Sequence, residues 1–281
     1  MLTKADAVLF EVEGMYQLPM KPKTGQVWVY VEMESPTYMP NGVAKWDNLF
    51  NWTMTYRRDS DIQTFYGSVW PKEQINRQKM EDFSKNKTAR MLWMVGHCKT
   101  PSKRENYIKE LQQFMDVDTI GRCGKRVCGR EKPCENEMLR QYKYYFAAEN
   151  SDCRDYITEK AFRTVLFPIL PAVRGGSNYS LYLPPKSYID VNTFNKAESF
   201  AKYIKTMDEN KDKYNEIFSW KNEYRGQYGV PDRLDPFCKL CERLHKENKY
   251  RRLYRSIRDW WRGNAKTTGD YFCPVNQLAK L

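Results

Sequence analysis

A strand, a helix and a second strand follow one another between residues 89 and 120, and this order indicates the fold class. Residues 89–95 (ARMLWMV) form a continuous apolar run that predicts a strand. Ser102 and Glu105 have the spacing of a capping box, which predicts the start of a helix. Residues 117–120 supply the next strand. Strands that are joined through a helix run parallel, so we expect a parallel sheet.

The same pattern continues toward the C-terminus. Residues 142–148 (YKYYFAA) and 170–174 predict two further strands, and helices are expected over about 155–167 and 195–208, the latter opened by a capping-box-like Asn195 and Glu198. A last helix runs to about residue 224. Residues 88–228 therefore predict one α/β unit of Rossmann type.

The part before this unit carries two expected strands, and the part after it is basic and aromatic. Residues 7–10 and 26–33 predict strands, and Pro36 ends the second one. We place a domain boundary in the polar connection 72–87. The expected domains are 1–87, 88–228 and a C-terminal tail, 229–281, that packs back on the first domain.

Composition narrows the partners without choosing among them. The 281 residues are 41% hydrophobic and 15% aromatic, enough for real cores. The formal net charge of +12 suits nucleic acid, an acidic membrane surface or a phosphorylated ligand. Neither a signal peptide nor an apolar run of membrane-spanning length is found in the sequence, so it predicts a chain without an anchor of its own.

Eight cysteines favour disulfides in an oxidising compartment, although their spacing leaves the pairing open. A different interpretation uses them as metal ligands. Cys238, Cys241 and His245, together with Cys123 and Cys128, could form a zinc site. With the basic, aromatic segment 246–262, that site would belong to a nucleic-acid-binding protein.

Polar side chains follow two of the expected strands at their carboxyl ends, where open parallel sheets bind ligands. Gly96-His97-Cys98 and then Arg104 follow the first strand, and Glu149 and Asn150 with Tyr156, Glu159 and Lys160 follow the strand 142–148. Helix N-termini suit phosphate, so an arginine and a lysine beside two of them would clamp a diphosphate. Neither the dinucleotide fingerprint nor the P-loop motif is present. The alternative is that Arg104 and Lys160 are solvated first-turn residues.

Several ordered motifs carry a specific likeness. They are residues 142–151 (YKYYFAAENS) with 155–160 (DYITEK), 51–62 (NWTMTYRRDSDI), Glu34-Ser-Pro36, 184–189 (PPKSYI) and Trp220-Lys221. Together they resemble the α1,3-fucosyltransferases of glycosyltransferase family 10, from about Asp6 to the tail. The cysteine pattern and residues 259–263 (DWWRG) are closest to the invertebrate and core-type members.

The resemblance implies a GT-B architecture, with a complete C-terminal Rossmann-like donor domain and a partial N-terminal Rossmann-like acceptor domain. Relatives carry an anchor, a stem and further βα units before the position of Asp6, and Cys238 and Cys241 match cysteines that bridge to that front. The chain is therefore expected to be a fragment or a truncated paralogue, from an enzyme held in the Golgi lumen by a single type II anchor.

The family match also implies residue roles. The general base would be Glu34, and the donor-binding residues would be Arg104 and Lys160 on the diphosphate, Asn150 and Tyr156 on the phosphates, Glu159 on the ribose, and Tyr145 and Glu149 lining the donor pocket. Glu32 points to the same face of its strand as Glu34, so the residues alone leave either as the base. Asp116 and Asp118 have the spacing of a metal-binding pair, but they lie at the wrong end of the sheet, and we expect a turn there.

The expected activity is inverting transfer of L-fucose from GDP-fucose, in α1,3 linkage, to GlcNAc of a glycoprotein N-glycan. No metal or cofactor is required, and stimulation by a divalent cation stays open. A catalytically inactive GDP-sugar-binding paralogue is the alternative, since Ala148 and Arg174 depart from the family pattern. The same match predicts no nucleic-acid partner.

Overall fold

The computed structural model describes residues 4–12, 15, 17, 23–75, 81–125, 132–229, 235–246, 252–266 and 269–278. The chain divides into two compact units. Unit 1 comprises Met1–Phe65, Ser151–Tyr156 and Val230–Leu281, and unit 2 comprises Tyr66–Asn150 and Ile157–Gly229. The domains expected at 1–87, 88–228 and 229–281 stay a prediction.

Unit 2 is built on a five-stranded parallel sheet, as the strand–helix–strand order predicts. Its strand order is β10 (Ile189–Asp190), β9 (Leu170–Arg174), β8 (Tyr142–Ala148), β6 (Thr88–Met94) and β7 (Val117–Ile120). Every neighbouring pair is parallel. The bounds predicted for β7, β8 and β9 are confirmed.

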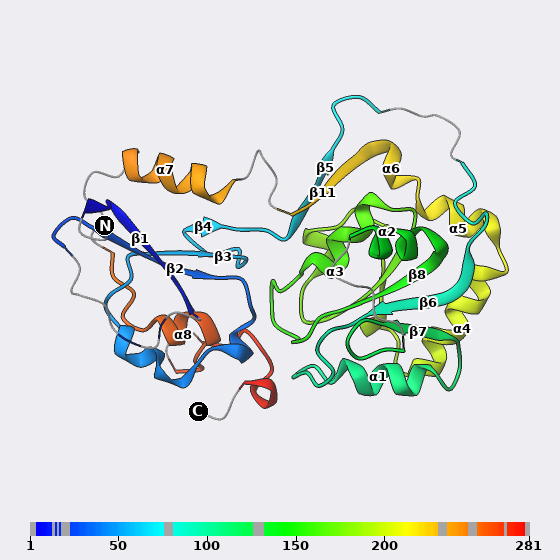
Figure 1. Cartoon of the computed structure of the whole chain (residues 1–281), viewed down its shortest axis with the longest axis horizontal. Coiled ribbons are helices and arrows are strands. Elements are labelled where there is room, and N and C mark those ends of the chain that lie inside the picture. Colours follow the sequence, from blue (N-terminus) through cyan, green and yellow to red (C-terminus); the bar gives the residue numbers. More distant parts are fainter. Residues whose placement is uncertain are drawn as a thin grey trace. The chain divides into compact units, whose positions relative to one another are not determined.

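Helices cover both faces of this sheet (Figure 1). One face packs against α1 (Arg104–Leu111), α4 (Ala197–Asp208) and α5 (Lys211–Ile217), and the other against α2 (Lys132–Gln141), α3 (Glu159–Phe162) and α6 (Trp220–Glu223). The apolar stripe of α4 is buried as its spacing predicts. The sheet is therefore the middle layer of a three-layer α/β sandwich.

Three helix starts differ from the prediction. The helix expected from residue 155 begins at Glu159, because the Thr158 side chain caps it, and a 3₁₀ turn (Arg163–Leu166) continues it. The capping box at Ser102 is wrong, since Thr100 donates to Glu105 while the Ser102 hydroxyl donates to the carbonyl of Glu149. No side chain caps α4, whose N-cap residue is Lys196, so the capping box expected at Asn195 is also wrong.

A two-stranded sheet in unit 2 was not expected from the sequence. β5 (Gly67–Pro71) pairs antiparallel with β11 (Tyr224–Tyr228), and the 3₁₀ turn after α3 packs against it. This pairing draws residues 66–71 into unit 2, ahead of the boundary expected in 72–87.

Unit 1 has a smaller parallel sheet, ordered β1 (Ala7–Glu11), β2 (Val27–Glu32), β3 (Trp52–Thr55) and β4 (Ile62–Gln63). Leu240 of α7 (Pro236–Lys246) packs on one face. Aromatic rings fill the other face, where Phe10, Trp28, Tyr30 and Phe50 contact Trp46 and Trp261. These last two rings come from a 3₁₀ helix (Asn41–Trp46) and from α8 (Ile257–Arg262).

Disulfides occur in both units. Cys98 pairs with Cys123 in unit 2, and Cys153 pairs with Cys273 in unit 1. Cys238 and Cys241 are exposed free thiols on α7. Cys123 was one of the zinc ligands expected for the alternative function, and this expectation is wrong because Cys123 is bonded to Cys98. Cys128, another expected ligand, lies outside the described residues. Within the described part of the chain, no helix is long and apolar enough to cross a membrane.

Candidate active site

A buried ion pair lies where β8 of unit 2 ends. Glu149 is fully buried, and its carboxylate accepts the backbone N–H of Thr158 at 2.9 Å and the Thr158 hydroxyl at 2.8 Å. Lys160 Nζ lies 3.1 Å from the same carboxylate and donates to the Thr158 hydroxyl at 2.7 Å. Thr158 thus caps α3 and at the same time joins the two charged side chains.

The electrostatics of this cluster keep Lys160 charged. Burial acts to lower the pKa of Lys160, but attraction to Glu149 and Glu159 outweighs it and raises that pKa above the ordinary value. Burial raises the pKa of Glu149, and Lys160 with the Thr158 donors opposes that rise. Burial also acts to raise the pKa of Glu159, yet Lys160 and Arg163 bring it below the ordinary value. The directions for Glu159 and Lys160 both favour their charged forms.

A second cation lies in the same unit at the start of α1. Arg104 is only 3% exposed, and its Nη1 donates to the carbonyl of Ala148 at 2.6 Å. Among the residues that the structure describes, Arg104 Nε has no hydrogen-bond partner. The charge of Arg104 opposes protonation of Lys160, so the two cations lie within electrostatic range of each other. The alternative that both are solvated first-turn residues is wrong, because Arg104 is buried and Lys160 is mostly so.

Tyr145 and Asn150 are the remaining predicted donor residues of unit 2. Tyr145 is 1% exposed and packs in the core, where burial raises its pKa and the charges of Arg163, Lys160 and Arg104 act on its hydroxyl. Asn150 is buried directly after Glu149, and its carbonyl accepts the N–H of Ser102 at 3.0 Å.

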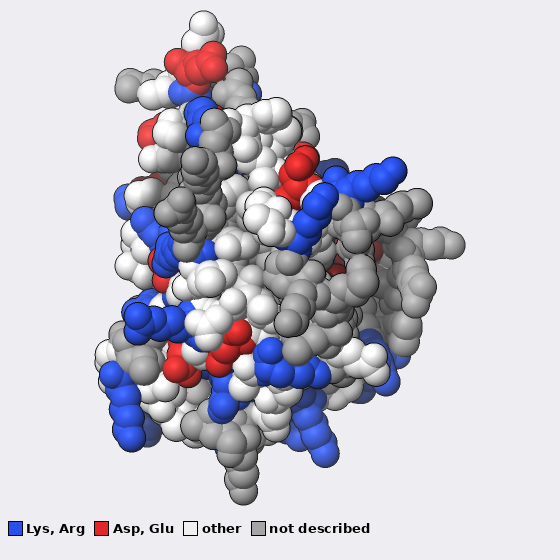
Figure 2. Space-filling model, turned by 90° about the vertical axis from the view of Figure 1, so that its left-hand side faces the viewer, with Lys and Arg blue, Asp and Glu red and all other residues white. Residues whose placement is uncertain are grey.

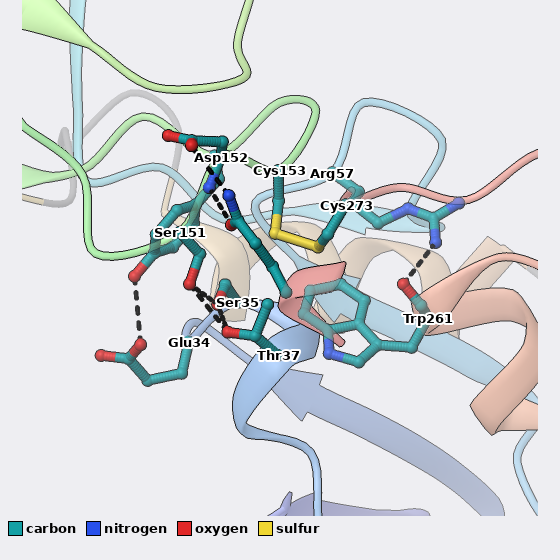
Figure 3. The surroundings of a disulfide bond; sticks show 11 residues. Glu34, Ser35, Thr37, Arg57, Ser151, Asp152, Cys153, Trp261 and Cys273 are labelled. Carbon is teal, nitrogen blue, oxygen red and sulfur yellow. Dashed lines mark hydrogen bonds between the residues drawn. A yellow bond between two sulfur atoms is a disulfide. The ribbon is translucent and has the colours of Figure 1, made fainter. Parts of the chain in front are cut away.

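The other two predicted residues, Glu34 and Tyr156, meet in unit 1. Glu34 is exposed, and its Oε2 accepts the Tyr156 hydroxyl at 3.1 Å (Figure 3 labels Glu34 and draws this bond). Tyr156 is 1% exposed, and its ring contacts that of Tyr56. The role predicted for Tyr156 on the phosphates stays a prediction.

Three buried hydroxyls hold the segment after Glu34 against the segment that carries Tyr156. Ser35, Thr37 and Ser151 form a triangle with oxygen–oxygen distances of 2.7 to 2.8 Å (Figure 3). The Cys153–Cys273 disulfide lies next to it and ties the same segment to the end of the chain. Hydrogen bonds thus fix the position of Glu34 relative to Tyr156, and the disulfide ties the Tyr156 segment to the end of the chain.

A buried carboxyl group lies just before Glu34. Glu32 is 9% exposed, and its Oε1 accepts the backbone N–H groups of Met33 at 2.8 Å and of Glu34 at 2.7 Å. Burial raises the pKa of Glu32 to about 7. Of the two candidate bases that the sequence left open, only Glu34 is exposed to an acceptor.

Sequence reasoning missed Thr158, the Ser35–Thr37–Ser151 triangle and the burial of Glu32. Thr158 precedes Glu159-Lys160, and a threonine before an acidic first turn is a capping signal that could have placed the helix start. The triangle joins residues more than 110 positions apart, so nothing local in the sequence announces it.

The basic residues of the tail are used within unit 1. Arg243 and Arg252 pair with Asp61, and Lys246 pairs with Glu242. Figure 2 shows a face on which the Lys and Arg side chains are spread out with acidic side chains among them. Such a distribution does not favour the basic stripe that a nucleic-acid backbone requires. Among the described residues, no group of three or more His, Cys, Asp or Glu is placed to hold a metal ion.

Comparison with known proteins decides the family. Residues 84–260 match the family model "Glycosyltransferase family 10 (fucosyltransferase) C-term", and residues 1–67 match "Fucosyltransferase, N-terminal". The chain belongs to glycosyltransferase family 10. Within that family it is 36% identical to Alpha-(1,3)-fucosyltransferase C of Drosophila melanogaster, over 91% of this chain and 65% of the relative.

Two further family 10 relatives and one solved structure agree with this assignment. Glycoprotein 3-alpha-L-fucosyltransferase A of Drosophila melanogaster is 34% identical over 94% of this chain and 53% of its own length. A 4-galactosyl-N-acetylglucosaminide 3-alpha-L-fucosyltransferase of Pongo pygmaeus is 36% identical over 92% and 72%. A crystal structure of an α1,3-fucosyltransferase with GDP-fucose superposes with a TM-score of 0.56 at 17% identity, over 81% of this chain and 79% of that one.

These likenesses confirm the α/β fold of GT-B type that the sequence predicts. The chain spans 65% and 53% of the length of the two fly relatives, so the activity and partners of the whole protein are treated as proposals below.

Proposed function

We propose that the protein transfers L-fucose from GDP-fucose, with inversion, to a hydroxyl of GlcNAc on a glycoprotein N-glycan in α1,3 linkage. One observation carries the proposal. Two buried cations, Arg104 and Lys160, lie within electrostatic range of each other at the carboxyl ends of parallel strands, and Arg104 keeps an N–H without a partner among the described residues. This is where open α/β sheets bind nucleotides, and the two cations suit a diphosphate.

In this proposal unit 2 holds the donor. Arg104 and Lys160 bind the diphosphate, Asn150 contacts the phosphates, Glu159 binds the ribose, and Tyr145 and Glu149 line the pocket. As the bond from fucose C1 to the GDP oxygen breaks, negative charge grows on the diphosphate. The fixed cations stabilise that charge, so the residues present supply what a metal ion would otherwise supply.

The acceptor side is assigned to unit 1, where Glu34 is the general base. Its carboxylate removes the proton from the acceptor hydroxyl while the oxygen attacks C1, and the new bond forms on the face opposite the departing GDP. The transition state has oxocarbenium character, as in glycoside hydrolysis. Glu34 suits this role because it is exposed and because Tyr156 orients one of its oxygens.

We also propose a Golgi-luminal location, with an anchor of type II in the full-length protein. The disulfides Cys98–Cys123 and Cys153–Cys273 support an oxidising lumen, since such bonds are rare in the cytosol.

The test is transfer of radiolabelled fucose from GDP-fucose to N-glycan acceptors, measured beside GDP binding by calorimetry. We expect Glu34→Gln to bind GDP like the wild type and to lower kcat by about 10²–10⁴-fold, the usual contribution of a general base. Glu11→Gln, an exposed carboxylate at the end of β1, is the matched control and should transfer normally.

Each other result has a defined meaning. GDP binding without transfer by the wild type would establish the inactive GDP-sugar-binding paralogue. Absence of both GDP binding and transfer would overturn the proposed function, and unchanged turnover of Glu34→Gln would remove the base assignment alone.

A further inference from the structure

The proposed reaction does not yet use Glu32, a carboxyl group that contacts the backbone of the proposed base, Glu34. Glu32 ends β2, and its neighbours across the sheet are Thr55 on β3 and, near the end of β1, Glu11. The sequence alone made it a solvated strand residue or a rival base. At 9% exposure it is not a solvated residue, and the exposed Glu34 is the more accessible of the two carboxylates.

The contacts of Glu32 are directed at Glu34. One oxygen, Oε1, accepts two successive backbone N–H groups, those of Met33 and Glu34, at 2.8 and 2.7 Å. A β-strand ends at Glu32, so these two N–H groups leave the regular ladder, and the side chain supplies the acceptor they need. The backbone of Glu34 is therefore held by its neighbour's carboxylate just before the hydroxyl triangle begins at Ser35.

We propose that Glu32 is a positioning residue, which fixes the backbone of Glu34 so that the catalytic carboxylate is presented in one orientation. The inference rests on the proposed function, since it assigns Glu32 a part in presenting the base. Misplacement of a reacting group by about 1 Å can cost 10²-fold in rate, so a hold on two amides has measurable consequences.

The surroundings of Glu32 make this hold sensitive to pH. Burial is the largest cause of its raised pKa, about 7, and the two backbone N–H groups oppose it. The carboxylates of Glu34 and of Glu11, on β1, raise it further, and the Tyr30 hydroxyl on β2 lies within range of its charge. Hydrogen bonds to a charged acceptor are stronger than those to a neutral one, so protonation of Glu32 weakens the hold on Glu34.

Three variants of the full chain separate the roles. Glu32→Ala removes the acceptor, and we expect kcat at pH 8 to fall about tenfold or more while KM for GDP-fucose stays within about twofold. Glu32→Gln keeps a neutral acceptor oxygen and removes the titration. It should keep kcat at pH 8 within about threefold of wild type, and its activity should start to fall at a lower pH. Glu11→Gln removes a nearby charge without touching Glu34, so its kcat should not show the tenfold fall.

A readout independent of transfer completes the experiment. Hydrogen exchange of the Met33 and Glu34 amides, expressed as protection factors between pH 5.5 and 8.5, should show protection in the wild type that rises through about pH 7 and is lost in Glu32→Ala. Normal turnover by Glu32→Ala, or an acidic limb in Glu32→Gln that matches the wild type, would overturn the proposal. A wild type that transfers no fucose would instead overturn the proposed function, and the amide exchange would then decide the backbone hold by itself.

Discussion

Glu149 in unit 2 and Glu32 in unit 1 are both buried carboxyl groups at the end of a parallel strand, yet their partners differ. Glu149 has a lysine at 3.1 Å and two donors from Thr158. Glu32 has two backbone N–H groups, and the charges that act most strongly on it are other carboxylates. A cation beside a buried carboxyl group opposes the rise in pKa that burial brings, as Lys160 does for Glu149, whereas Glu32 has no such cation and a pKa of about 7. Unit 2 is thus suited to binding anions and unit 1 to handling protons.

The largest effect is expected from removing the cation of unit 2. Lys160→Met leaves Glu149 buried without its counter-charge, which should lower the free energy of unfolding by about 3–5 kcal/mol. The double variant Lys160→Met/Glu149→Gln removes both charges and should recover most of that loss in urea unfolding. Neither variant should bind GDP like the wild type. A single variant as stable as the wild type would show that the ion pair is not what distinguishes the two sites.

Glu32→Gln should change stability in the opposite direction. The folded pKa, about 7, lies above the ordinary 4.5, so the folded chain binds more protons than the unfolded chain between these values. Stability therefore falls as pH rises from about 4.5 to about 7, by up to about 3 kcal/mol. The variant should lose this part of the pH dependence and be more stable than the wild type at pH 8. If urea unfolding gave the same change in the free energy of unfolding between pH 5 and pH 8 for both proteins, this prediction would be contradicted.

Arg104→Met tests whether the second cation serves the ligand or the fold. Its guanidinium makes a bond to the Ala148 carbonyl and keeps a buried Nε without a partner among the described residues, so we expect GDP affinity to fall about 10- to 100-fold, the usual range for a charged hydrogen bond. Lys109→Met, an exposed cation on the same helix, is the control and should bind GDP within about twofold of wild type by calorimetry. Equal affinities in the two variants would return Arg104 to a structural role.

Tyr156→Phe should give the smallest effect and sharpen the division between the units. The loss of one hydrogen bond to Glu34 should lower kcat about three- to tenfold and leave the Kd for GDP unchanged. Weakened GDP binding with normal kcat would instead assign Tyr156 to the phosphates, as the family resemblance implies. Tyr56→Phe, whose ring contacts Tyr156, controls for the packing.

Local sequence signals predicted the sheet of unit 2 well and its helix starts poorly. β8 and β9 are continuous apolar segments whose ends are marked by Glu149 and Gly175, so their bounds needed no tertiary information. Ser102 has the spacing of a cap but donates to Glu149 instead, because the chain just after β8, 47 residues later, supplies a carbonyl there. Pairing of β5 with β11 joins segments about 150 residues apart, which no local pattern encodes.

The candidate site divides in the same way. The identities of Glu34, Arg104 and Lys160 follow from the family motifs, whereas the protonation behaviour of Glu32 does not. A glutamate at a strand end with alternating neighbours is usually solvated, and only the packing of β1 and β3 on either side of β2 makes it buried. Burial, and therefore pKa, is a property of the assembled sheet.

The Cys153–Cys273 disulfide can form only after both of its cysteines have been synthesised. Its two sulfurs are separated by 120 residues, which a ribosome adds in about 6–24 s at 5–20 residues per second. During that interval the thiol of Cys153 is without its partner, while strands β9, β10 and β11 of unit 2 are still being made. Unit 1, which carries Glu34, is therefore the last to close, although residues up to Phe65 are made before any of unit 2, and a nascent chain captured before Cys273 would be open to mispairing with the thiols of unit 2.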